Sequence, residues 1–181
     1  MFGLAEPEGP VEADRLVVRI GHHHRSTFAG FDIHPSSIEA AREAAVQAGV
    51  DHRTRFEVAG AADLPGQGYD LACVFHTLHE MGDPVVAARR IRQALAGDGT
   101  LLLVEPYAGD ALEDSLSLIG RGFYALPAVV QPPGSRGQDS GPDVNAQSGE
   151  SALMSVLGDA GFSQFRRVAL TPMSVVLEAK P

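Results

Sequence analysis

The sequence is poor in basic residues, and it has no long hydrophobic run. Its 14 Lys and Arg residues stand against 23 Asp and Glu residues, which gives a formal net charge of −9 at pH 7. Binding to nucleic acid or to an anionic membrane needs clustered basic side chains, so neither is expected as a partner. No apolar stretch approaches the length that crosses a bilayer, so no membrane span is predicted.

Cysteine is nearly absent, since Cys73 is the only one, and an internal disulfide is therefore excluded. Its setting, YDLACVF, predicts a buried strand position. The acidic start MFGLAEPEGPVEADR does not resemble a secretory signal. Together with the free thiol it predicts a cytoplasmic protein. We expect residues 1–14 to form a flexible tail ahead of one domain at 15–181.

Short apolar runs alternate with helical patterns along that domain. The predicted strands are 15–20, 27–33, 54–60, 69–75 and 100–106, and the predicted helices are 36–49, 84–97 and 150–161. This order predicts an α/β fold, a Rossmann-like, mostly parallel sheet with helices on both faces. Two further strands, at 163–170 and 173–179, predict a closing antiparallel hairpin.

Two helix starts carry capping signals. Ser36 and Glu39 form a capping-box pattern ahead of the helix that stops at Gly49. Asp83 followed by Pro84 predicts the N-cap and the first position of the next helix.

The segment 108–149 interrupts the alternation. Its second half, QPPGSRGQDSGPDVNAQSG, is rich in Pro, Gly, Ser and Asp and has no apolar periodicity. Long segments of this kind in a compact domain are typically lids or disordered. We therefore predict a lid or insert.

Acidic residues follow two of the predicted strands, where open parallel sheets bind ligands. Asp32 ends the second strand, and its carboxylate could accept both hydroxyls of a ribose or simply begin the next helix. Asp63 follows the third strand, and it could accept a hydrogen bond from a purine amine or form a turn.

The loop FHTLHEMGDP follows the fourth strand. His79 could act as a general base oriented by Glu80 or Glu105, or it could be a solvated loop histidine. Glu105 lies so close to the sheet that it needs a partner, in a structural or a functional role. The adjacent histidines His22–His24 predict no metal site, because neighbouring side chains point in different directions.

Four segments together resemble class I S-adenosylmethionine-dependent methyltransferases. They are FAGFDIHPSSIEAAREAA, FEVAGAADLPGQGYDLACVFHTLHEMGDP, IRQALAGDGTLLLVEP and LGDAGFSQFRRV. The resemblance covers residues 27–181 and is closest to small-molecule methyltransferases with an N-terminal helical domain, which has no counterpart here. It implies S-adenosylmethionine as the cofactor and a small molecule as the methyl acceptor.

The resemblance also implies how the cofactor is held. Asp32 would bind the ribose, with Ile33 beside the adenine. Ala62 and Asp63 would line the adenine.

The loop after the fourth strand would approach the reacting centre. By the same resemblance, Phe75 and His76 would flank the sulfonium. His79 matches the histidine of the LHDW stretch of O-methyltransferases, which deprotonates the acceptor hydroxyl, and Met81 stands in place of the Trp.

The sequence departs from the family at the glycine-rich loop after the first strand. The family pattern is Asp/Glu-x-Gly-x-Gly-x-Gly, whereas this stretch reads VVRIGHHHR, with Gly21 as the one glycine left to contact the cofactor. Only GHHHRS remains to join two parallel strands, which predicts that the first helix is missing. The exposed sheet face would then invite a second copy of the chain or another protein.

Two hypotheses of function follow from this departure. The chain is a methyltransferase whose activity is impaired by loss of the loop, or it is a non-catalytic, methyltransferase-derived protein-binding module. A nicotinamide-dependent oxidoreductase would share the sheet and the ribose carboxylate. The loop after the fourth strand and the closing hairpin count against it.

Overall fold

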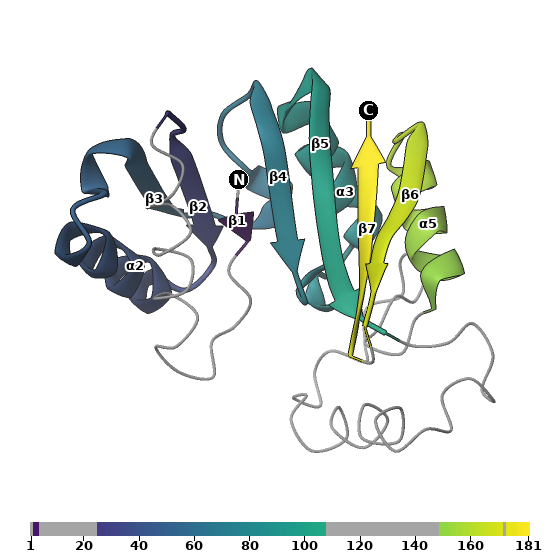
Figure 1. Ribbon diagram of the computed structural model, residues 1–181, viewed down its shortest axis with the longest axis horizontal. Coiled ribbons are helices and arrows are strands. Elements are labelled where there is room, and N and C mark those ends of the chain that lie inside the picture. The colour runs from purple at the N-terminus through teal and green to yellow at the C-terminus, as the bar shows by residue number, and fades with distance from the viewer. Residues whose placement is uncertain (1, 4–24, 108–148, 172) are drawn as a thin grey trace.

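The computed structural model describes residues 2–3, 25–107, 149–171 and 173–181, and these form an α/β structure around one sheet (Figure 1). The strands are β1 (Phe2–Gly3), β2 (Phe28–Asp32), β3 (Thr54–Val58), β4 (Tyr69–Phe75), β5 (Leu95–Pro106), β6 (Gln164–Leu170) and β7 (Ser174–Lys180). The helices are α2 (Pro35–Gln47), α3 (Pro84–Ala94) and α5 (Glu150–Asp159), with short 3-10 turns η1 (Asp51–Arg53), η2 (Ala61–Asp63) and η3 (Leu78–Glu80).

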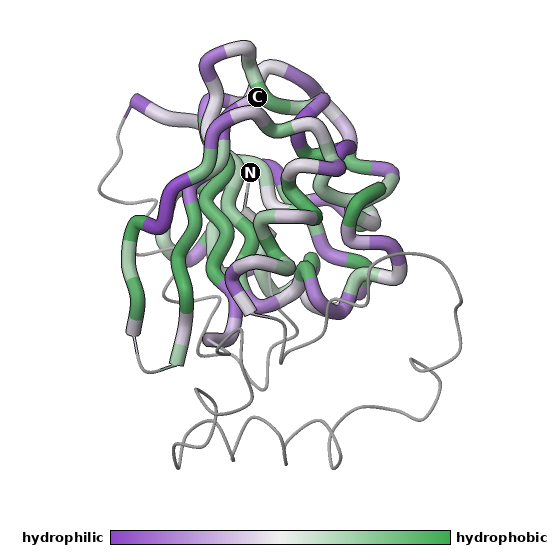
Figure 2. Tube along the Cα trace, turned by 90° about the vertical axis from the view of Figure 1, so that its right-hand side faces the viewer, coloured by the Kyte–Doolittle hydropathy of each residue, from purple (hydrophilic) through white to green (hydrophobic). Residues whose placement is uncertain are grey.

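The described strands lie in the order β3-β2-β1-β4-β5-β7-β6. Strands β1 to β5 pair in parallel, whereas β7 runs antiparallel to both β5 and β6. The predicted mostly parallel sheet and its C-terminal hairpin are confirmed. Figure 2 shows the central strands as continuous hydrophobic segments, while hydrophobic and hydrophilic positions alternate along the helices.

Helices cover both faces of the sheet, as predicted. A Cβ placed on Gly30 would lie 2.6 Å from the Phe56 ring, so these two residues share a face, and Phe56 packs there against Ile38 of α2. The next residue, Phe31, points to the opposite face, since side chains alternate along a strand. Phe31 belongs to the larger core cluster, which includes Ile91 of α3 and residues of α5.

The central position between β2 and β4 is held by residues from the start of the chain. Phe2 and Gly3 pair in parallel with β2, and Phe2 also pairs with Cys73 of β4. The prediction that residues 1–14 form only a tail is therefore wrong for these two residues.

Chain length gives the physical reason for that correction. From Gly3 to Phe28 there are 28 − 3 − 1 = 24 intervening residues, enough for an ordinary parallel crossover, whereas six would have to be fully stretched. With β1 at Phe2–Gly3, the chain length before β2 does not require the first helix to be missing. Residues 15–20, Gly21 and the predicted lid up to residue 148 lie outside the described residues.

The first described helix begins two residues earlier than the capping-box pattern predicts, because its N-cap is His34 and not Ser36. Helix α2 starts at Pro35 with His34 as N-cap, because the fixed φ of proline suits the first helical position. The backbone N–H of His34 is bound by Asp32 Oδ1 at 2.7 Å. Gly49 ends the helix as predicted, with φ of +67°.

Helix α3 begins as predicted and ends earlier. Asp83 caps it by accepting the backbone N–H of Val86 at 2.9 Å, with Pro84 in the first turn. The helix stops at Ala94, not at Gly97, because Leu95 is extended and pairs with Tyr69 of β4. Within the described ranges, no helix is both long enough and apolar enough to cross a membrane.

Candidate active site

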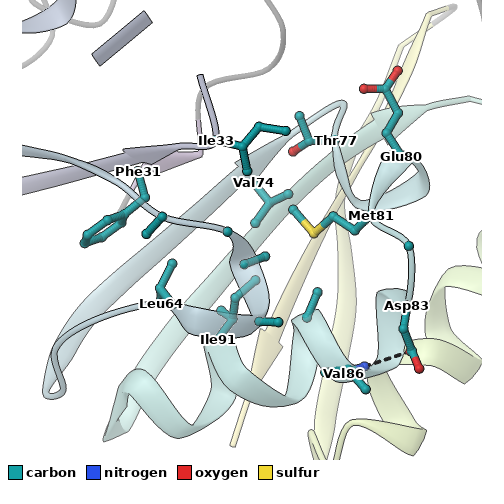
Figure 3. A pocket seen from close by; sticks show the side chains of 16 residues that line it. Phe31, Ile33, Leu64, Val74, Thr77, Glu80, Met81, Asp83, Val86 and Ile91 are labelled. Carbon is teal, nitrogen blue, oxygen red and sulfur yellow. Dashed lines mark hydrogen bonds between the residues drawn. The ribbon is translucent and has the colours of Figure 1, made fainter. Parts of the chain in front are cut away.

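A cavity of about 450 Å³ opens where β2, β3 and β4 end, between these strand ends and helix α3 (Figure 3). Most of its wall is apolar. The larger side chains that line it are Phe31, Ile33, Leu64, Val74, Met81, Val86 and Ile91. This is the edge at which ligands of open parallel sheets bind, and its volume falls in the range of small-molecule sites.

The residues predicted to contact ribose and adenine divide into two groups. Ile33 and Ala62 line the cavity. Asp32, which precedes Ile33, is only 7% exposed, and its Oδ1 is occupied by the N–H of His34. Asp63 is exposed on turn η2, where its own N–H bonds the Gly60 carbonyl, and it is outside the described cavity wall.

Phe75 and His76, which were predicted to flank the sulfonium, lie at the end of β4 but are not among the described residues that line the cavity. Phe75 pairs with Val104 in the sheet. His76 has a φ of +50°, which is unusual for a residue other than glycine, and its N–H donates to the Val104 carbonyl at 2.7 Å. The His76 Nε2 atom lies 3.0 Å from Ser174 Oγ, so the ring points toward β7. The next residue, Thr77, lines the cavity instead.

His79 and Glu105 form a closely bonded, buried pair. His79 Nδ1 lies 2.6 Å from Glu105 Oε2, and the side chains are 7% and 2% exposed. The other carboxylate oxygen of Glu105 accepts the backbone N–H of Leu78 at 2.9 Å. Of the two carboxylates that could orient His79, Glu105 is therefore the one bonded to Nδ1. The alternative prediction, a solvated loop histidine, is wrong because the His79 side chain is buried. Glu80 lies on the other side of the ring, with Oε1 3.7 Å from Nε2.

This arrangement raises the pKa of His79 above its ordinary value of 6.5. Burial alone would lower that pKa, because desolvation disfavours the charged ring. The hydrogen bond and charge of Glu105, together with the charge of Glu80, outweigh burial. The ring therefore holds its proton to a higher pH than a free imidazole does.

The raised pKa predicts a pH dependence of stability. Since the folded-state pKa lies above the unfolded value, the contribution of His79 should be fully present below pH 6.5 and be lost as pH rises through the folded-state pKa. We expect the difference in free energy of unfolding between wild type and His79→Gln, from urea denaturation, to shrink with rising pH. A difference that stays constant from about pH 5.5 to about pH 9 would contradict this.

Several cavity residues were not predicted from sequence. Helix α3 forms part of the cavity wall through Val86, Ala87 and Ile91. The spacing of Ala87 and Ile91 by about one helical turn is the sequence pattern that indicates a shared helix face. Thr77 lies in the loop FHTLHEMGDP, in which the sequence predicts roles for the histidines but none for the threonine. The Thr77 hydroxyl is buried without a hydrogen-bond partner among the described residues. Within the same residues, no group of three or more His, Cys, Asp or Glu side chains is placed to hold a metal ion.

Comparison with known proteins identifies the family. A family described as "Methyltransferase domain" matches residues 15–129, which is more than half of the 181 residues. No curated protein matches the chain by sequence.

Solved structures with the same fold are known. The S-adenosylmethionine-dependent methyltransferase SibL is 21% identical with a TM-score of 0.68. PigF, solved with SAH (S-adenosylhomocysteine), is 16% identical with a TM-score of 0.70. An O-methyltransferase family 2 protein from Planctomyces limnophilus, solved with apigenin, is 13% identical with a TM-score of 0.69. Each match covers 99% of this chain and 50% of the other, so the chain spans about half the length of these proteins. At these identities the likeness shows the fold alone.

Proposed function

This chain belongs to the methyltransferase domain family, and on that premise we propose that it binds S-adenosylmethionine in the cavity between β2 and α3 and transfers the methyl group to a small molecule. The observation that carries the proposal is the cavity itself. It lies at the carboxyl ends of the parallel strands, it is mainly apolar, and it begins beside a buried carboxylate, Asp32. The likeness to PigF, which was solved with SAH, supports the same cofactor.

The walls fit the parts of that cofactor. Ile33, Leu64 and Val74 offer apolar surfaces to a flat adenine ring. Asp32 uses Oδ1 for the turn into α2, which leaves Oδ2 for the hydroxyls of a ribose at this end. When bound, S-adenosylmethionine supplies an electrophilic methyl group on a sulfonium.

The chain would contribute a base for the acceptor. Glu105 binds Nδ1 of His79, which fixes the ring and leaves Nε2 to take the proton of an acceptor hydroxyl. Only the neutral ring can do this, so the raised pKa of His79 should make the rate climb with pH through that pKa. Apigenin in the relative from Planctomyces limnophilus supports a small-molecule acceptor.

The second candidate is the non-catalytic binding module. The observation that favours it is the stretch VVRIGHHHR, which keeps one glycine where the family has three. Loss of the backbone N–H groups of a glycine-rich loop would weaken the hold on the methionine part of the cofactor.

Calorimetric titration with S-adenosylmethionine and with SAH tests the proposal. We expect micromolar binding by wild type and at least tenfold weaker binding by Ala62→Trp, because the larger side chain would fill the cavity. Ala40→Trp is a matched control, because Ala40 is also exposed but lies on α2 outside the described cavity wall. A folded wild type that binds neither ligand at millimolar concentration would favour the binding module.

A further inference from the structure

The charged side chains on the cavity wall are all acidic. Among its described lining residues, Glu80 and Asp83 carry charge, and no Lys, Arg or His side chain is present. Arg90, on the helix beside the cavity, is bound to the Leu64 carbonyl. The described wall therefore carries negatively charged and no positively charged side chains.

The two carboxylates are not equivalent. Asp83 accepts the N–H of Val86 at the N-terminus of α3, where the helix dipole offsets its charge (Figure 3). Glu80 lies at the rim of the cavity, 46% exposed, and its closest charged neighbour is the His79 ring. Because its contact with the His79 ring, at 3.7 Å, is longer than a hydrogen bond, Glu80 is the carboxylate better placed to act on a ligand.

The loop fixes Glu80 in this place. Leu78 and His79, which precede it in η3, are both held by Glu105 at 2.9 Å and 2.6 Å. His79 is 7% exposed, and its Nε2 faces Glu80, which lines the cavity. The buried pair thus presents Glu80 to the cavity, and Glu80 is the charged member of the group on the described cavity wall.

We propose that Glu80 makes the cavity selective for a cationic ligand, so that the methyl donor is held more tightly than the neutral product. This inference rests on the proposed function. Methyl transfer breaks the S–CH₃ bond and leaves its electron pair on sulfur, while the methyl carbon bonds to the acceptor oxygen and the hydroxyl proton passes to His79. The positive charge on sulfur disappears in that step, and with it the attraction to Glu80. Loss of this attraction would favour release of the product.

The test is the ratio of two dissociation constants, that of SAH over that of S-adenosylmethionine, measured by calorimetry for each variant. Glu80→Gln keeps the shape and removes the charge, so we expect the ratio to fall by about two- to fivefold, a modest factor because Glu80 is half exposed to solvent. Glu80→Asp should keep most of the wild-type ratio. Glu39→Gln is the matched control, because Glu39 is exposed on α2 away from the cavity, and it should leave the ratio unchanged.

Salt gives a second readout that needs no variant. Raising NaCl from about 20 mM to about 500 mM should lower the wild-type ratio toward that of Glu80→Gln, since ions screen exposed charges. A ratio that is the same in wild type and Glu80→Gln overturns the inference and leaves the proposed function standing. A folded wild type that binds neither ligand overturns both.

Discussion

Replacing Glu105 with alanine is expected to lower the free energy of unfolding by about 3 kcal/mol, measured by urea denaturation at neutral pH. The side chain is 2% exposed, and both of its oxygens are in use. Alanine would leave the N–H of Leu78 buried without its acceptor, and it would leave Nδ1 of the His79 ring without its partner. Losses of this size are typical when one partner is removed from a buried pair.

Two variants separate the causes of that loss. Glu105→Gln keeps an oxygen for the N–H of Leu78 but removes the charge, so it should cost less than alanine and let the pKa of His79 fall. Glu178→Ala removes a glutamate that pairs with Arg166 at the surface, and it should change stability little. If Glu105→Ala and Glu178→Ala lowered the free energy of unfolding equally, the buried pair would stabilise the fold no more than the surface pair does.

Replacing Asp32 with alanine should weaken binding of S-adenosylmethionine at least tenfold, because a ribose would lose the carboxylate that accepts its hydroxyls. The same change removes the acceptor of the His34 N–H, so it should also lower stability, by about 1 kcal/mol. Calorimetry measures the first effect and urea denaturation the second.

Asp32→Asn divides the two roles of this residue. The amide oxygen can still accept the N–H of His34, so folding should be nearly normal, while the ribose loses the charged acceptor. We expect this variant to be stable and still to bind the cofactor poorly. Wild-type binding by a folded Asp32→Asn would mean that Asp32 only begins helix α2.

Local signals made much of this site predictable from sequence. Asp83 and Pro84 mark the start of α3 by their own chemistry, and the four strand ends were found from short apolar runs. Because parallel strands end at one edge of a sheet, placing Asp32 and His79 at strand ends was enough to bring both to this edge. The sequence left Glu80 and Glu105 as alternatives for orienting His79, and in the structure Glu105 is the one bonded to Nδ1.

The features that were missed depend on partners far away in the chain. Two residues, Phe2 and Gly3, carry no periodic pattern, so their place in the sheet is set by pairing with β2 and β4. The direction of the His76 ring depends on a positive φ and on Ser174, 98 residues away. The exposure of Asp63 is decided by how turn η2 folds, which its residue type does not reveal.

The short strand β1 also affects how the protein unfolds locally. Helix α2 and strand β3 share a small core of their own, formed by Ile38, Ala41, Ala45, Val50 and Phe56. Among the described residues, Phe2 and Gly3 of β1 join β2 to β4. Local unfolding follows such boundaries, so the amide hydrogens of β2, α2 and β3 should exchange together while β4 to β7 stay closed. The cavity wall has Ile33 on one side of this boundary and Val86 on the other. A bound ligand would therefore couple the two units and slow exchange in both.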